Sequence, residues 1–114
     1  MVINSMTPEE AYEICSKSKG ERIHELEQII LNSNDSNIVY NYVCFIIRGP
    51  FPEGEAILAT DTYWSVAYSI NFLKAPFEKA HKKIFEKSDY NQIMVNKYKG
   101  FLDNIGYNYS EWII

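Results

Sequence analysis

The stretch that decides the fold is NIVYNYVCFIIRGPFPEGEAILAT, residues 37–60, because its order of features returns along the chain. An apolar segment leads to a basic residue and a glycine, and a proline-containing break then precedes a second, shorter apolar segment. Residues 11–33 and 64–88 have the same order, displaced by 26 to 28 positions, and a fourth, partial copy begins at Asp89. Repeats of this length are typical of stacked helix pairs that bury their apolar faces against their neighbours. We therefore predict an all-α fold, a short α-helical repeat stack of about three and a half helix pairs of about 28 residues each.

Length and composition fit one folded domain. The 114 residues, 46% of them hydrophobic, suffice to bury a core, so we expect a single α-helical repeat domain over residues 1–114. The formal charge of -4 makes direct nucleic-acid binding an unfavoured function. The N-terminus lacks the features of a secretory signal, and the most apolar run, residues 38–47, is too short to span a bilayer, so we expect no membrane contact and a cytoplasmic location. Cys15 and Cys44 lie in apolar helical patterns and are interpreted as buried thiols without a disulfide.

Capping residues and apolar spacing place the individual helices. Thr7-Pro8-Glu9-Glu10 has the arrangement of a capping box and predicts a first helix over Pro8–Lys19. A third helix is expected over residues 38–47 with Asp35 or Ser36 as its N-cap; a strand is the alternative there, since Ile, Val, Tyr and Phe favour strands. The other expected helices are a second with Ile23, Leu26 and Ile30, a fourth over Pro52–Ala59, a fifth capped by Asp61, a sixth with Phe77, Ala80 and Ile84, and a seventh capped by Asp89.

The predicted core follows from the same periodicity. The side chains expected to be buried are Leu26, Val43, Ile46, Ile70, Ile84 and Phe101. The expected stripe of the seventh helix is Tyr90, Ile93, Met94, Lys97, Tyr98, Phe101, Leu102 and Ile105, with Lys97 contributing its aliphatic stem. The lysines of the sixth helix alternate with glutamates and are interpreted as a solvated face.

Few residues point to catalysis. His24 and His81 are isolated, have no metal-ligand spacing with a cysteine, and are interpreted as surface or boundary residues. The recurrence of Glu27 at Glu55 is better explained by a repeated structural role than by catalysis. We therefore expect no enzyme activity, no cofactor and no bound metal.

Residues 39–58, VYNYVCFIIRGPFPEGEAIL, and more weakly residues 66–84, VAYSINFLKAPFEKAHKKI, resemble a short helical repeat with the pattern A-Y-x-Y-A-x-x-V-I-K-G-x-W-P-E-A-E-x-x-I. This repeat occurs in tandem in uncharacterised proteins of large-genome tailed bacteriophages and giant viruses. The resemblance extends over parts of residues 11–102 and is specific in residues 49–58, whereas the later copy has Ala75 in place of the glycine and lacks the proline-glutamate pair. The resemblance implies a small α-helical repeat protein of viral origin and assigns no catalytic residue.

Two hypotheses of function follow. The first is a non-enzymatic protein-binding module, a phage accessory factor that binds and inhibits or redirects a host protein, including a host defence component, in the host cytoplasm. The second is a small enzyme or ligand-binding domain with a site between helices. For the first, the turn around Phe51 and the aromatic tail would form an exposed aromatic surface with an acidic edge, although the tail could instead fold back over the last helix. The expected partner-binding residues are Phe51, Glu53, Glu55, Tyr107, Tyr109 and Trp112.

Overall fold

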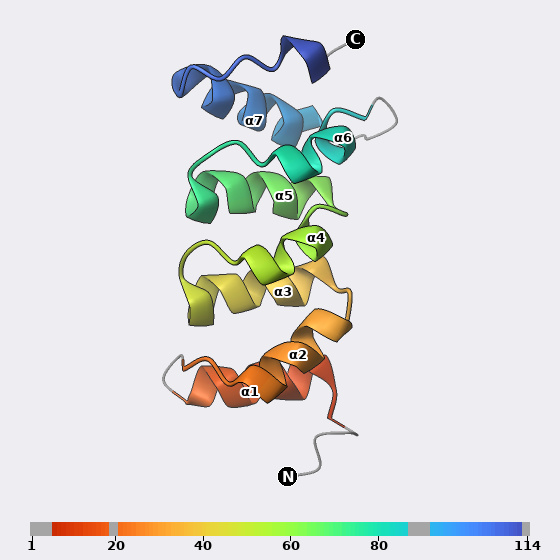
Figure 1. The fold of residues 1–114 in the computed structure, drawn as a ribbon, viewed down its shortest axis with the longest axis vertical. Helices are drawn as coiled ribbons and strands as arrows, with labels where there is room; N and C mark the ends of the chain where they lie inside the picture. The colour runs from red at the N-terminus through yellow and green to blue at the C-terminus, as the bar shows by residue number, and fades with distance from the viewer. Residues whose placement is uncertain (1–5, 19–20, 87–91, 113–114) are drawn as a thin grey trace. The chain divides into compact units, whose positions relative to one another are not determined.

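The computed structural model describes residues 6–18, 21–86 and 92–112, and most of these residues are helical (Figure 1). They contain no strand, which confirms the all-α prediction and removes the strand alternative for the third predicted helix. The chain divides into two compact units, Met1–Ile57 and Leu58–Ile114. This division does not test the expectation of a single domain, which stays a prediction.

The first unit begins with three helices that pack against one another, α1 (Pro8–Lys17), α2 (His24–Asn32) and α3 (Ser36–Tyr42). The start of α1 is the predicted capping box. The Thr7 hydroxyl accepts a hydrogen bond from the Glu10 N–H, and the Glu10 carboxylate accepts one from the Thr7 N–H, both at 3.1 Å. Asp35 caps α3 by accepting hydrogen bonds from two backbone N–H groups. The α1 helix ends at Lys17, and the predicted end at Lys19 lies outside the described residues.

The third helix ends in an unusual way. It continues from α3 as a π-helical turn over Val43–Ile47, and the next residue, Arg48, has a left-handed backbone with φ 59°. The Arg48 N–H donates to the carbonyl of Val43 at 2.7 Å and closes the helix. The break that the sequence indicates at residues 49–52 therefore begins at Arg48. A 3-10 turn (Pro52–Gly54) then leads into the short helix α4 (Glu55–Leu58), close to the predicted fourth helix.

The second unit shows the same succession and adds a longer helix. Its elements are α5 (Thr62–Tyr68), a π-helical turn (Ser69–Leu73), a 3-10 turn (Glu78–Ala80), α6 (His81–Ile84), α7 (Gln92–Asn104) and a last 3-10 turn (Ser110–Trp112). As predicted, Asp61 caps α5, since its side chain accepts a hydrogen bond from the Trp64 N–H at 3.0 Å. Both α6 and α7 pack against α5. The predicted cap of α7, Asp89, lies outside the described residues.

The local geometry of the first unit recurs in the second. Each π-helical turn ends in a left-handed basic residue, Arg48 or Lys74, whose N–H donates at 2.7 Å to the carbonyl five positions earlier. In each unit a buried phenylalanine follows three positions later and packs its ring, at a tilted angle, against a tyrosine of the preceding helix. These pairs are Tyr42–Phe51 and Tyr68–Phe77, with ring centroids 5.6 and 5.2 Å apart. Residues 37–60 and 64–86 thus share this local structure, whereas the predicted stack of about three and a half helix pairs stays a prediction.

Two neighbouring positions of the first copy carry different residues in the second. A Cβ added to Gly54 would lie 2.7 Å from the Phe51 ring and 2.9 Å from the Val39 side chain. In the second unit, Ala80 stands at the position of Gly54, and the smaller Ser65 stands at the position of Val39. The second copy therefore accommodates a methyl group at the position where Gly54 leaves no room for one.

Burial confirms most of the predicted core. Leu26, Val43, Ile46 and Ile84 are buried as expected, with between 0% and 5% of their surface exposed. The prediction is wrong for Ile70 and Phe101, which are only half-buried. Both lie at the edge of an apolar stripe, where spacing alone does not decide between a covered and a partly covered position.

The buried face of α7 is narrower than the predicted stripe. Its buried residues are Met94, Val95, Tyr98 and Leu102, of which Val95 was not predicted. Ile93, Lys97 and Ile105 are exposed, with Ile93 at 82%, and Tyr90 lies outside the described residues. The wrongly included Ile93 and Lys97 each precede a buried residue by one position, so the stripe was drawn too far around the helix. Single exposed apolar residues are common on folded proteins, which is why apolarity alone did not place Ile93.

Replacing Gly54 by alanine is expected to lower the free energy of unfolding by about 1–3 kcal/mol, because the added methyl group overpacks the Phe51 ring. Replacing Gly100 by alanine should raise it by about 0.5–1 kcal/mol, because Gly100 lies within α7 with open space at its Cβ position and alanine favours helix more than glycine. Urea titration followed by far-ultraviolet circular dichroism measures both. Equal effects of the two substitutions would contradict the tight packing at Gly54.

Candidate functional site

The turn after Arg48 buries its phenylalanine. Phe51 was expected on an exposed aromatic surface, but none of its surface is exposed. Its ring packs against Tyr42, and the Arg22 guanidinium lies 5.5 Å from the ring centroid. The expectation is wrong because the repeat uses this aromatic ring to anchor the turn to the core. A partner could reach the ring only if the turn opened.

A charged cluster joins the same turn to α2. The Arg22 guanidinium donates two hydrogen bonds to Glu27, at 3.0 and 3.1 Å, and one to the exposed Glu53, at 3.1 Å. Glu27 is 5% exposed and also accepts a hydrogen bond from the Tyr42 hydroxyl at 2.9 Å. Burial, and then the hydrogen bond to Glu27, raises the pKa of Tyr42. These contacts agree with the structural role inferred for Glu27, and its counterpart Glu55 is buried as well.

The aromatic tail packs against α6 and the residue that follows it. The ring pairs are His81–Tyr107, His81–Trp112 and Phe85–Tyr109, with centroids 5.7, 5.0 and 5.9 Å apart. All three tail rings belong to half-buried residues, as expected if the tail folds back. These residues belong to the second unit, whereas Phe51 and Glu53 belong to the first. The structure therefore describes the expected partner-binding residues as two separate groups.

His81 is fully buried, so its interpretation as a surface or boundary residue is wrong. Its Nε2 lies 2.6 Å from the Tyr98 hydroxyl oxygen, which also accepts a hydrogen bond from the Phe77 N–H at 2.8 Å. Burial lowers the pKa of His81, an effect that the nearby Glu78 carboxylate opposes, and the ring is neutral at pH 7. Burial also raises the pKa of Tyr98 to about 12. No local pattern in the sequence indicates this environment, because the rings around His81 come from three separate segments.

The two cysteines are free thiols. Cys15 is buried, as predicted, whereas Cys44 is half-buried. Burial raises the pKa of both thiols, so both are protonated at neutral pH. Because the thiolate is the reactive form, neither residue is an activated nucleophile.

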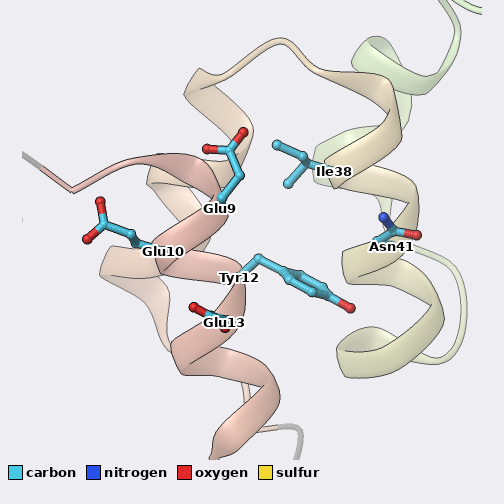
Figure 2. Close-up of a pocket in the computed structure, with 6 residues that line it drawn as sticks. All are labelled: Glu9, Glu10, Tyr12, Glu13, Ile38 and Asn41. Atoms are coloured by element: carbon cyan, nitrogen blue, oxygen red, sulfur yellow. The ribbon is translucent and has the colours of Figure 1, made fainter.

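An open groove of about 320 Å³ lies between α1 and α3. In Figure 2, Tyr12 extends from α1 toward α3, and the Glu9 side chain lies on the side of α1 that faces Ile38, whereas the Glu10 carboxylate points away. The groove is lined by Glu9, Glu10, Tyr12, Glu13, Ile38 and Asn41. It therefore combines apolar surface from Tyr12 and Ile38 with carboxylates at its edge.

The carboxylates of this groove differ in what they contact. The Glu10 carboxylate is used in the capping box, and the hydrogen bond from the Thr7 backbone lowers its pKa. Within the part of the chain that the structure describes, the carboxylates of Glu9 and Glu13 make no hydrogen bond or ion pair. Burial, and then the proximity of Cys44, raises the pKa of Tyr12, so its hydroxyl is protonated. The groove thus offers free negative charge next to an apolar surface.

The groove belongs to the more acidic half of the chain. Residues 1–57 contain nine Asp or Glu and four Lys or Arg, a formal charge of -5, whereas residues 58–114 contain six and seven, a formal charge of +1. Negative potential is therefore concentrated in the first unit. A cationic partner is attracted to this unit more strongly than to the chain as a whole.

This groove is not among the sites predicted from the sequence. The available signal was the spacing of Glu9 to Tyr12 and of Glu9 to Glu13, three and four residues, which makes an aromatic ring and a second carboxylate neighbours of Glu9 on the helix surface. Nothing in the sequence showed that α3 would place Ile38 opposite this face.

Within the described ranges, no three His, Cys, Asp or Glu side chains are grouped so that they could hold a metal ion. None of the helices in those ranges is long and apolar enough to cross a membrane. No protein-family model, curated protein or solved structure matches this chain. The viral repeat family therefore stays a prediction from the quoted motifs.

Replacing Arg22 by alanine is expected to lower the free energy of unfolding by about 1–3 kcal/mol, because the buried Glu27 carboxylate loses its charged donor. Lys17→Ala removes an exposed cation from the end of α1 and should change the free energy of unfolding by less than about 0.5 kcal/mol. Urea titration of the two variants measures the difference. If both lose the same stability, Arg22 contributes only general surface charge.

The acid sensitivity of the second unit is expected to depend on His81. Since its pKa is lowered in the folded state from the ordinary value of 6.5, the unfolded chain takes up the proton first. Stability is therefore retained above about pH 6.5 and falls as the pH drops below it, by at most about 1.4 kcal/mol per pH unit. Glu78, Tyr98 and Tyr107 are the other titratable groups around the ring, and the two tyrosines stay protonated over this range.

The test is urea unfolding at pH 7 and pH 5.5, followed by tryptophan fluorescence, because Trp64 and Trp112 both lie in the second unit. His81→Gln should show a smaller loss of stability at the lower pH than the wild type. His24→Gln, which changes an exposed histidine of α2, serves as the matched control. Equal pH dependence in all three proteins would show that His81 is not the acid-sensitive group.

Proposed function

We propose that this chain is a non-enzymatic protein-binding module, an accessory factor of a bacteriophage that binds a host protein in the host cytoplasm and inhibits or redirects it, including a host defence component. The viral origin is supported by the resemblance of residues 39–58 to the tandem repeat of phage and giant-virus proteins. The binding role is supported by the groove between α1 and α3.

The observation that carries the proposal is that the buried polar groups make hydrogen bonds within the fold, whereas the exposed Glu9 and Glu13 carboxylates of the groove make none among the described residues. The buried Glu27 and His81 are each bonded to a tyrosine hydroxyl of a later helix and so hold the fold together. The carboxylates of Glu9 and Glu13, by contrast, are exposed, form no contact among the described residues, and lie beside Tyr12. Exposed carboxylates that make no contact with the described residues and line a partly apolar groove are suited to binding.

The groups suited to catalysis are poorly placed for it. The two thiols are protonated, and the neutral His81 ring is enclosed by aromatic side chains. The partner of His81 Nε2 is the Tyr98 hydroxyl, whose pKa of about 12 makes it a weak acid. A general acid or base works best with a pKa near the working pH and with access to a substrate. The pKa of Tyr98 is far from neutral, and the complete burial of His81 keeps a substrate away from its ring.

The alternative function is a small ligand-binding domain or enzyme with its site between helices. The groove volume of about 320 Å³ favours it as a second candidate, because small-molecule sites begin at about 300 Å³. Under this alternative the groove would bind a compact cation, and no protein would be needed to fill it.

The experiment that separates the two functions is affinity capture from host lysate with the tagged protein, followed by purification of the captured protein and calorimetric titration. We expect one saturable complex with a protein. Tyr12→Ala should weaken it by about tenfold, because it removes the aromatic surface of the groove, whereas Tyr63→Ala, which removes an exposed aromatic ring of the second unit, should not. The small ligand-binding domain or enzyme would be favoured by two results together. No captured protein would bind again after purification, and the wild type would retain a small molecule that Tyr12→Ala does not retain.

A further inference from the structure

The geometry points to the kind of partner that the groove accepts, an inference that rests on the proposed function. We propose that the groove binds a protein segment carrying a lysine or arginine next to an apolar residue. The aliphatic stem of the basic side chain would lie on Tyr12 and Ile38, and its charged head would reach the carboxylates of Glu9 and Glu13.

Charge complementarity is the first argument. The free carboxylates of Glu9 and Glu13 lie on one helix at a spacing of four residues, so they lie one above the other on the same face of α1. They repel each other, and a single cation between them would remove that repulsion. The acidic first unit strengthens the attraction at longer range, since the surplus of carboxylates in residues 1–57 adds to the local field.

The apolar part of the groove is the second argument, because it distinguishes a basic side chain from a simple ion. Tyr12 and Ile38 are half-buried and provide apolar surface between the carboxylates and α3. A metal ion has no apolar part to bury against such a surface, whereas lysine and arginine have long aliphatic stems that cover it. An aromatic ring also attracts a cation placed over its face, which adds to the preference for a basic side chain over a neutral one.

An exposed phenylalanine extends the surface beyond one side chain. Phe45 lies in the π-helical turn that follows α3 and is 57% exposed. Ile38, Asn41 and Phe45 follow one another at spacings of three and four residues, which aligns them along one side of the helix. Because Phe45 is the next large apolar side chain in this row, the bound segment is expected to carry an apolar residue beside its basic one.

A second copy of this chain fits the groove less well. Two lysines of the second unit already have interactions within the chain: Lys83 forms an ion pair with Glu86 at 3.6 Å, and Lys79 also has a partner. The formal charge of that unit is only +1. Its net attraction to an acidic groove is therefore weak, and a partner with an excess of lysine or arginine is favoured.

The test uses a fluorescent synthetic peptide in which leucine and lysine recur at helical spacing, and a matched peptide with glutamine in place of every lysine. Fluorescence anisotropy measures binding to the full chain. We expect the lysine peptide to bind at least about tenfold more tightly than the glutamine peptide, and the difference to shrink in high salt as the charges are screened. Equal binding of the two peptides would overturn the proposal.

Two double variants with the same change in net charge locate the binding. Glu9→Gln with Glu13→Gln should weaken lysine-peptide binding by about tenfold, because both free carboxylates of the groove are lost. Glu21→Gln with Glu25→Gln changes exposed residues that do not line the groove and should weaken binding far less. Equal losses in the two variants would mean attraction by net charge alone and would overturn the proposal.

Competition separates this inference from the proposed function. If a purified protein partner binds the chain and the lysine peptide displaces it, the groove is the shared site and the proposal is supported. If that partner binds together with the peptide, the binding-module function stands and the groove inference is wrong. A dimer of the chain alone, seen by light scattering and lost in Glu9→Gln with Glu13→Gln, would make a second copy the occupant and would also overturn the proposal.

Discussion

A buried tyrosine hydroxyl, hydrogen-bonded to a polar side chain of an earlier helix, is the contact on which each unit depends. In the first unit Tyr42 donates to Glu27 at 2.9 Å, and in the second unit Tyr98 lies 2.6 Å from Nε2 of His81. A buried hydroxyl without a partner costs about 1–3 kcal/mol, so the two helices must meet where the hydrogen bond forms. Apolar burial brings the helices together, and this polar contact selects one arrangement among several with similar apolar burial.

The two units satisfy the tyrosine with different chemistry, and the surroundings differ accordingly. A buried carboxylate needs compensation for its charge, and Arg22, two residues before α2, supplies it while also bonding to Glu53. A neutral histidine needs no counterion, so the rings of Tyr107 and Trp112 can pack against His81 instead. The aromatic tail in the second unit and the ion pairs in the first are therefore two consequences of which polar residue bonds to the tyrosine.

Sequence periodicity predicted the parts of this fold that depend on neighbouring residues. The capping box at Thr7, the caps Asp35 and Asp61, and most of the core follow from spacing and local hydrogen bonding, so they could be derived in advance. Burial of Phe51 and His81 depends on residues far along the chain, and no local pattern reports such contacts. The groove was missed for the same reason: the spacing of Glu9 and Tyr12 is visible in the sequence, but the position of α3 beside them is not.

Two faces of α1 have different roles: one packs in the core, and the other lies at the groove. Ala11 and Cys15 are fully buried and lie four residues apart on one face of α1, the helix that packs against α2 and α3. Glu9 and Glu13 are exposed at the groove and contribute no contact to the described structure. Because exposed residues without partners contribute little to stability, the groove can change its charge or its shape while the core stays intact. The same helical framework could therefore accept different partners through changes confined to the exposed face of α1 and the facing residues of α3.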